Sequence, residues 1–151
     1  MTEASDIEER AFIHTRLIDA PPARVFRAFS EPERLARWWG PKGFSSTFER
    51  CEFRPGGDWH FVLHGPDGTD YPNHCVFTAI EAGHRLVIDH LPPGHHFQLT
   101  VDLGAQGGQT LLRWQQVFDT IEEHQRIAGF VPEANEQVLD RLQAEVANIP
   151  S

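Results

Sequence analysis

The stretch from Arg54 to Gly68, RPGGDWHFVLHGPDG, decides how the middle of the chain folds. Its paired glycines, Gly56-Gly57, resemble a phosphate-binding loop at first sight. Such a loop needs a helix directly after it, so that the backbone amides at the helix N-terminus face the anion. Here residues 58–64 alternate between apolar and polar side chains, which is the pattern of a strand. We therefore predict a corner at the glycines, then a strand, then a hairpin turn at Pro66-Asp67-Gly68.

Strand patterns continue on both sides of this hairpin. The connections between them are short and rich in Gly or Pro, which favours antiparallel hairpins over parallel crossovers. Between the first strand and the rest lie two short helical segments, one starting near Pro22 and one at the apparent capping box Ser30-Glu33. The predicted strands are 10–18, 44–54, 58–64, 73–81, 85–91, 96–103 and 110–118.

The last part of the chain is predicted to be helical. Thr120 to Glu123 has the form of a capping box, and apolar residues then recur every three or four positions as far as Val146. Pro132 interrupts this apolar stripe. We expect the helix to break or kink there, because proline removes a backbone hydrogen bond and clashes with the preceding turn.

These elements predict an α+β fold in a single domain, residues 10–151, after a flexible N-terminal tail, residues 1–9. A sheet of seven strands has one apolar face, and the long C-terminal helix is the only element large enough to cover it. Strand twist curves such a sheet around the helix. The two short helices then close one end, and a cavity is left between sheet and helix.

Composition and charge narrow the range of partners. The 151 residues include 22 acidic and 13 basic side chains, giving a net charge of -9, which repels nucleic-acid backbones. No run of about 18 apolar residues is present, so no membrane partner is expected. The acidic, polar start argues against a secretion signal and predicts a cytoplasmic location. Cys51 and Cys75 are expected to be reduced, buried thiols.

Several spaced segments resemble a known family. They are APPARVFRAFSEPERLARWWGP (20–41), FRPGGDWHFVLHGPDG (53–68), HRLVIDH (84–90) and NEQVLDRLQAEV (135–146). With the order of elements, they resemble START-like, birch-pollen-allergen-like proteins of the SRPBCC superfamily. Within it, the chain is similar to bacterial homologues of the C-terminal domain of the activator of the heat-shock chaperone ATPase. The resemblance implies the helix-grip fold, a curved seven-stranded antiparallel sheet wrapped around a long C-terminal helix. It implies no single function, because this fold hosts ligand carriers, cyclases and co-chaperones.

Side chains alternate between the two faces of a strand, and this alternation (strand parity) selects residues for the cavity wall. Trp59 and Phe61 share one strand face, and His90 shares a face with apolar residues of another strand. On the helix, the residues near Pro132 are small or polar, so the cavity should open at that end. The full set of predicted ligand-binding residues is Trp38, Trp59, Phe61, His90, Trp114, Gln116, Phe118, Phe130, Val131, Ala134 and Asn135.

Three functions are compatible with such a cavity. The leading hypothesis is a non-enzymatic binding protein for a small hydrophobic or aromatic molecule, because the predicted wall is aromatic with few titratable groups. The second is a cyclase- or dehydrase-type enzyme that uses His90 and Gln116 inside the cavity. No GxSxG nucleophile motif is present, and no catalytic residue is assigned.

The third hypothesis is a chaperone-associated interaction module. Adjacent residues on a helix diverge by about 100°, so one surface cannot bury both Trp38 and Trp39. One of them then gates the cavity or forms an exposed patch, unless loops cover both. The full activator has a separate N-terminal domain that contacts the chaperone, and no segment of this chain corresponds to it.

The nine histidines raise the question of a metal site. His60 and His64 share a strand face, but about 13 Å separates them along the strand, too far for one ion. His90, His95 and His96 gather around one turn, yet the adjacent pair points to opposite sides of its strand. We therefore expect no bound metal and no cofactor. A homodimer formed through an edge strand stays open.

Overall fold

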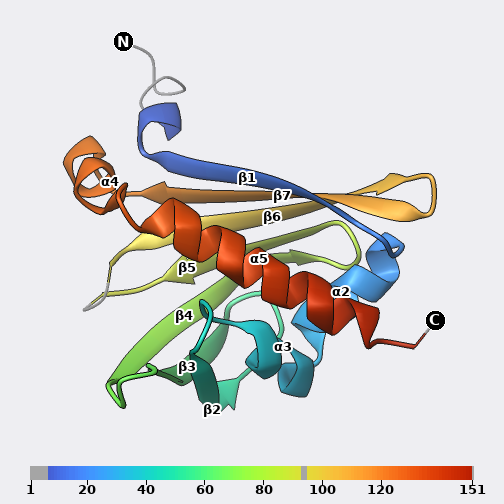
Figure 1. Cartoon of the computed structure of the whole chain (residues 1–151), viewed down its shortest axis with the longest axis horizontal. Coiled ribbons are helices and arrows are strands. Elements are labelled where there is room, and N and C mark those ends of the chain that lie inside the picture. The colour runs from blue at the N-terminus through green and yellow to red at the C-terminus, as the bar shows by residue number, and fades with distance from the viewer. Residues whose placement is uncertain (1–6, 93–94, 151) are drawn as a thin grey trace.

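The computed structural model describes residues 7–92 and 95–150 (Figure 1). Within these ranges seven strands form one antiparallel sheet in the order β1-β7-β6-β5-β4-β3-β2. The strands are β1 (Ala11–Ile18), β2 (Ser45–Cys51), β3 (Gly57–His64), β4 (Asp70–Glu81), β5 (Arg85–His90), β6 (Phe97–Gln106) and β7 (Gln109–Phe118). The helices are α2 (Pro22–Ser30), α3 (Pro32–Trp38), α4 (Ile121–Ile127) and α5 (Val131–Ala147). This architecture confirms the predicted α+β helix-grip fold.

The glycines of the Arg54–Gly68 stretch form a corner, as predicted. Gly56 has a φ of +80°, a conformation that favours glycine because it has no Cβ. A Cβ on Gly57 would lie 1.9 Å from the carbonyl oxygen of Glu52, so no side chain fits there. Strand β3 begins at Gly57 and pairs antiparallel with β4. The stretch is therefore a β-corner and a hairpin.

Several strands are longer than the sequence predicts. Strand β4 begins at Asp70 rather than at residue 73, because Asp70 pairs with His64 at the end of β3. Strands β6 and β7 continue to a turn of only two residues, Gly107 and Gly108, with φ of 58° and 84°. Two consecutive residues with positive φ match the twist of a hairpin, so the longer connection predicted between residues 103 and 110 is wrong.

The predicted flexible tail, residues 1–9, falls partly outside the described residues, which begin at Ile7. Residues 7–9 form a helical turn, and Arg10 donates its backbone N–H to the carbonyl of Ile7 at 3.1 Å. The flexibility of the tail stays a prediction. The predicted turn at Pro92-Pro93-Gly94 also lies partly outside the described residues.

The junction of α2 and α3 differs from the predicted capping box. Ser30 is the last residue of α2, and Glu31 is the N-cap of α3 without a side-chain capping bond. The Glu31 carboxylate instead accepts hydrogen bonds from Arg27 and Arg34, both at 2.7 Å. Because α2 ends only at Ser30, this side chain cannot also cap α3. The box predicted there is wrong, although both helices form.

The C-terminal helical region is broken as predicted. Thr120 caps α4 by accepting the backbone N–H of Glu123 at 3.1 Å. A new helix, α5, begins at Val131 with Pro132 in its first turn, where proline needs no hydrogen-bond partner. None of the helices in the described ranges combines the length and apolar character needed to cross a bilayer.

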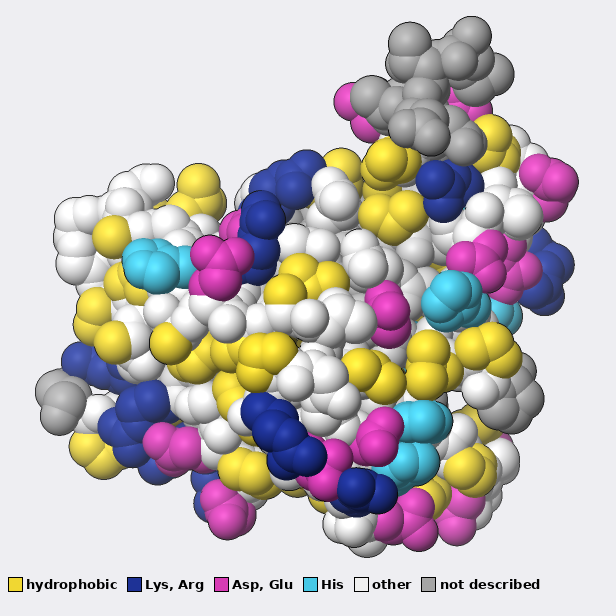
Figure 2. All heavy atoms as spheres, turned by 180° about the vertical axis from the view of Figure 1, so that it is seen from behind, with side chains coloured by type: hydrophobic (Ala, Val, Ile, Leu, Met, Phe, Trp, Pro, Cys, Tyr) yellow, Lys and Arg dark blue, Asp and Glu magenta, His cyan; other side chains and the backbone are white. Residues whose placement is uncertain are grey.

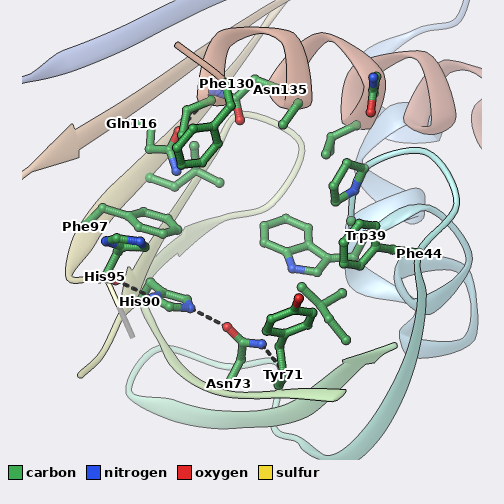
Figure 3. Close-up of a pocket in the computed structure, with 18 of the residues that line it drawn as sticks. Trp39, Phe44, Tyr71, Asn73, His90, His95, Phe97, Gln116, Phe130 and Asn135 are labelled. Carbon is green, nitrogen blue, oxygen red and sulfur yellow. Dashed lines mark hydrogen bonds between the residues drawn. The ribbon is translucent and has the colours of Figure 1, made fainter. Parts of the chain in front are cut away.

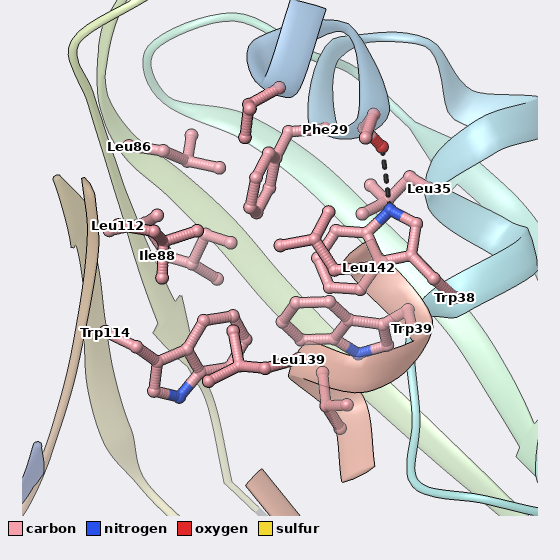
Figure 4. Close-up of a cluster of buried hydrophobic side chains, with 14 of the residues drawn as sticks. Phe29, Leu35, Trp38, Trp39, Leu86, Ile88, Leu112, Trp114, Leu139 and Leu142 are labelled. Carbon is pink, nitrogen blue, oxygen red and sulfur yellow. Dashed lines mark hydrogen bonds between the residues drawn. The ribbon is translucent and has the colours of Figure 1, made fainter. Parts of the chain in front are cut away.

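Helix α5 lies across one face of the sheet, and α2 and α3 close one end (Figure 1). Leu139 and Leu142 of α5 are fully buried between the helix and the sheet. Each such side chain contributes about 1.5–3 kcal/mol by leaving water. The core around them contains Phe29, Leu35, Trp38, Trp39, Leu86, Ile88, Leu112 and Trp114 (Figure 4).

A polar contact joins α5 to the edge strand β1. The Arg16 guanidinium donates to Glu136 at 2.7 Å, to Asp140 at 2.9 Å and to Gln143 at 2.9 Å. His14, two residues earlier on the same strand face, lies 2.5 Å from the Glu136 carboxylate. These bonds explain why the inward face of β1 carries polar side chains, and they set the position of α5 over the sheet.

Candidate functional site

A pocket of about 640 Å³ opens between the sheet and the start of α5 (Figure 3). Strands β3 to β7, the segment after α3 and the first turns of α5 supply its walls. Most of the lining is apolar, and much of it is aromatic. The aromatic side chains of the lining are Trp39, Phe44, Phe61, Tyr71, Phe97, Trp114 and Phe130.

The apolar stripe of α5 explains why the space is open at this end. Toward the C-terminus of the helix, Leu139, Leu142 and Val146 are buried and fill the gap to the sheet. Near Pro132 the corresponding positions are the small Ala134 and the polar Asn135, which fill less of this space than the leucines do. The pocket therefore lies beside the first turns of α5, where the small side chains leave space.

Eight of the eleven residues predicted for binding line this pocket. Their role in binding stays a prediction, but the fold does bring them together from four separate segments. They are Phe61, His90, Trp114, Gln116, Phe130, Val131, Ala134 and Asn135.

Trp38 is not one of the lining residues, and Trp39 takes its place. Trp38 is 0% exposed, and its indole Nε1 donates to the Ala28 carbonyl at 2.9 Å. Trp39 follows the last residue of α3 with extended backbone, φ −70° and ψ 120°. The helical divergence assumed from the sequence therefore does not apply. Both indoles are buried, one in the core and one against the pocket, so the exposed patch is excluded among the three alternatives.

Helix α5 holds the segment that carries Trp39. The Arg141 guanidinium donates to three backbone carbonyls, those of Arg37 at 2.8 Å, Gly40 at 2.7 Å and Pro41 at 3.0 Å. Burial lowers the pKa of Arg141 below its ordinary value, yet the side chain stays charged at neutral pH. The loop between α3 and β2 is thereby fixed to the same helix that forms the opposite wall.

Trp59 and Phe118 also lie away from the pocket. Trp59 is 0% exposed and stacks on Phe77 with ring centres 5.4 Å apart. Phe118 belongs to a separate cluster with Phe12 and Ile127 near α4. Both side chains point inward as predicted, but other core residues surround them. Strand parity gives the face of a residue and not its position along the cavity.

His90 is the polar centre of the sheet wall. Its Nδ1 lies 2.5 Å from the carbonyl oxygen of His95, and its Nε2 lies 2.6 Å from Asn73 Oδ1. The Asn73 amide in turn donates to the Tyr71 carbonyl at 2.7 Å. The imidazole also stacks on Phe97, with ring centres 4.6 Å apart and planes 4° from parallel. The His95 carbonyl and the Asn73 side chain therefore lie against the two ring nitrogens (Figure 3).

Burial decides the charge of His90. The ring is 9% exposed, and desolvation lowers the pKa of His90 below the ordinary value for histidine. The neutral ring keeps its proton on Nδ1, because the His95 carbonyl can only accept. A second proton on Nε2 would allow a bond to the Asn73 oxygen, but burial opposes that charge. At neutral pH the pocket wall is uncharged at this position.

His90 should make the protein less stable in mild acid. Its pKa is lowered in the folded state, so the unfolded chain binds a proton first as the pH falls below about 6.5. We expect the free energy of unfolding to fall more steeply with decreasing pH in the wild type than in His90→Gln. The slopes should differ by up to about 1.4 kcal/mol per pH unit. Urea unfolding between about pH 7.5 and about pH 5.5 measures both, and equal slopes would contradict a neutral buried imidazole.

A second polar group lies on the opposite side of the pocket. The amide of Asn135, on α5, donates to Gln116 Oε1 on β7 at 3.0 Å, and both side chains are buried. The same amide nitrogen lies 3.4 Å from His14 Nε2. Nearby, the indole Nε1 of Trp114 is a buried donor that has no hydrogen-bond partner among the described residues. The site thus offers hydrogen-bonding groups within an apolar wall.

Several lining residues were missed from the sequence. Asn73 shares a face of β4 with the buried Cys75 and Phe77, and Leu99 shares a face of β6 with Phe97 and Val101. The same parity argument applied to these strands finds them. Tyr71 shares this face of β4 too, but it lies before residue 73, where the predicted strand begins. Phe44 lies just before β2 and is brought to the pocket by the chain path alone.

The two cysteines and the histidines near the β5–β6 turn do not form a nucleophilic or metal-binding site among the described residues. Burial raises the pKa of Cys51 to about 11 and also raises the pKa of Cys75, so both are protonated, free thiols. His95 pairs with Glu123, and His96 pairs with Asp119 at 2.9 Å. His90, His95 and His96 therefore each face a different partner and do not converge on one metal ion.

Comparison with known proteins gives one family and many solved structures of the same fold. The model of the family described as Activator of Hsp90 ATPase homolog 1-like protein matches residues 19–147. A protein from Arthrobacter aurescens solved by NMR is 29% identical with a TM-score of 0.87, and the match covers 97% of this chain and 90% of that one. A crystal structure from Nitrosomonas europaea is 21% identical with a TM-score of 0.85, covering 93% and 96%. The AHSA1-like protein from Aeromonas hydrophila is 21% identical with a TM-score of 0.69, covering 91% and 93%. No curated protein matches this chain.

Proposed function

Because the chain belongs to the Activator of Hsp90 ATPase homolog 1-like family of the SRPBCC superfamily, we propose that it is a binding protein for a small, flat, largely apolar molecule. This family's fold is often a ligand-binding one. The ligand would occupy the pocket between the sheet and α5. The observation that carries the proposal is the pocket itself, about 640 Å³ with a mainly aromatic lining. Its volume lies within the range of about 300–1,000 Å³ that small-molecule sites occupy.

The lining defines the chemistry of the ligand. Trp39, Phe61 and Trp114 offer ring faces and edges, which favour an aromatic or otherwise planar molecule. The charged lining residues Lys42 and Glu133 are exposed, so the interior demands little charge from the ligand. The unpartnered Trp114 Nε1 favours a ligand with a hydrogen-bond acceptor, because an unsatisfied buried donor costs about 1–3 kcal/mol.

The mouth of the pocket supports the same proposal. Phe130 is 58% exposed at the N-cap of α5, beside the opening. A large apolar side chain in water gains about 1.5–3 kcal/mol when a ligand covers it. The exposed ring thus favours binding of an apolar molecule over an empty pocket.

Two observations favour binding over the alternative functions. A general acid or base needs a nitrogen that a substrate can reach, but the His95 carbonyl lies 2.5 Å from Nδ1 of His90 and the Asn73 side chain lies 2.6 Å from Nε2. A chaperone-binding patch built on Trp38 or Trp39 needs an exposed indole, and both are buried. The enzyme and interaction hypotheses therefore rank below binding.

Native mass spectrometry of the purified full chain tests the proposed function. We expect part of the protein to carry a bound small molecule, seen as an added mass. This molecule should be released on unfolding and should be soluble in organic solvent. The reason is that an apolar pocket open to the cell contents fills with molecules that leave water favourably. Anilinonaphthalene sulfonate (ANS) fluorescence then measures whether the emptied pocket binds an aromatic probe. A chain that carries no extra mass and binds no ANS would contradict the proposal.

A further inference from the structure

Three side chains with metal-binding atoms meet on the outer face of the sheet. Asp58 and His60 are two residues apart on β3, so both side chains point to the same side. His74 lies directly opposite His60 on β4, in register. One potential ligand atom from each of the three lies within 4.8 Å of the other two. The sequence expectation of no metal considered His60 with His64 along one strand and overlooked this cross-strand partner.

The spacing of these atoms is close to that of ligands around one ion. His74 Nε2 lies 3.0 Å from Asp58 Oδ1, and the His60 and His74 rings stack with centres 4.0 Å apart. Tetrahedral ligands at about 2.0–2.1 Å from Zn²⁺ lie about 3.3 Å from one another. Because the nitrogen lone pairs lie in the ring planes, the two imidazoles must rotate out of this stack to aim at one ion. All three are only partly buried, so they have room to rotate.

We propose that Asp58, His60 and His74 bind one divalent transition-metal ion, with Zn²⁺ as the reference case. Two imidazole nitrogens and one carboxylate oxygen form a donor set that suits zinc and its neighbours better than Mg²⁺ or Ca²⁺. A fourth position stays open to water. The backbone helps, because strand pairing already fixes all three ligand-bearing residues before the ion arrives.

The charges around the cluster are compatible with a cation. Arg50 lies opposite His60 on β2, which would repel a metal ion. Its guanidinium, however, is bound to the Glu52 carboxylate at 2.6 Å. The other oxygen of Glu52 accepts the backbone N–H of Asp58 at 3.1 Å. Glu52 thus offsets part of the positive charge of Arg50 and of Arg54, which lies 3.5 Å from it, and it supports the residue that supplies the oxygen ligand.

The proposed site is separate from the pocket. Trp59 and Phe61 alternate with Asp58 and His60 along β3, so the pocket and the metal cluster lie on opposite faces of the sheet. Figure 2 shows the outer face, where histidine side chains lie next to acidic ones. A bound ion would join β3 to β4 without touching the pocket ligand. Its effect would be to stabilise the folded state, because it binds that state and not the unfolded chain.

Zinc titration of the untagged full chain tests this site. Isothermal titration calorimetry with Zn²⁺ should show one equivalent bound by the wild type, and affinity at least about tenfold weaker in His60→Ala and His74→Ala. Zn²⁺ should also raise the melting temperature of the wild type and have a smaller effect on both variants. Thermal unfolding without metal confirms that each variant folds.

His64→Ala is the matched control. His64 lies on the same strand face and also faces a carboxylate, Asp70, at 2.7 Å, but it belongs to no three-ligand group among the described residues. Its replacement should leave zinc affinity unchanged. The proposal is overturned if the wild type binds no Zn²⁺, if His74→Ala binds it as tightly as the wild type, or if His64→Ala loses as much affinity as His74→Ala.

Discussion

Replacing Ala134 with tryptophan should abolish ANS binding by this protein while leaving the chain folded. Ala134 lines the pocket and is only partly buried, so the new indole enters open space rather than a closed core. Filling space costs less than overpacking, and we expect the free energy of unfolding to change by less than about 1.5 kcal/mol. Fluorescence titration measures the binding, and urea unfolding measures the stability.

Ala144→Trp is the control for that experiment. Ala144 lies on the same helix but is exposed to solvent outside the pocket lining. The same change of residue there should leave ANS affinity at the wild-type value. If Ala134→Trp unfolds the protein, or if it binds ANS as well as Ala144→Trp does, the pocket beside α5 is not the binding site. The proposed function would then lose its main support, whereas the outer-face metal site would be unaffected.

Trp38→Ala should have the largest effect on stability. The indole is 0% exposed, makes an edge contact with Phe29 at 4.9 Å between ring centres, and donates to the Ala28 carbonyl at 2.9 Å. Truncation leaves an enclosed cavity and an unpaired carbonyl. We expect a loss of about 3–5 kcal/mol in the free energy of unfolding, a large part of the total stability of an ordinary domain. Urea unfolding followed by far-UV circular dichroism measures this loss.

The neighbouring residue provides the comparison. Trp39→Ala also removes an indole, but Trp39 borders the pocket, so the change enlarges an existing opening and creates no new enclosed void. Its cost should be about half that of Trp38→Ala, since the cavity contribution is absent. ANS affinity should fall in Trp39→Ala, whose ring lines the site. Equal losses of stability in both variants would mean that the two side chains are packed alike.

The sequence alone determined the elements and their general arrangement. The α+β sheet-and-helix fold followed from patterns that depend on neighbours in the chain. These are the period-two alternation in residues 58–64, the Gly- and Pro-rich connections and one long apolar stripe that Pro132 interrupts. The inward faces of β3, β5 and β7 followed for the same reason, because side chains of a strand must alternate. The short side chains of Ala134 and Asn135 marked the end of α5 beside which the pocket lies.

Only the tertiary structure decided which inward residues face the pocket and which face other side chains. Trp59 and Phe118 have the parity of lining residues, and Trp38 was expected beside the cavity, yet all three are enclosed by other core side chains. The pairing of His60 with His74 likewise depends on the register of β3 against β4. Alternation is a local property of the backbone, whereas helix placement and strand register are set by the packing of segments far apart in the chain.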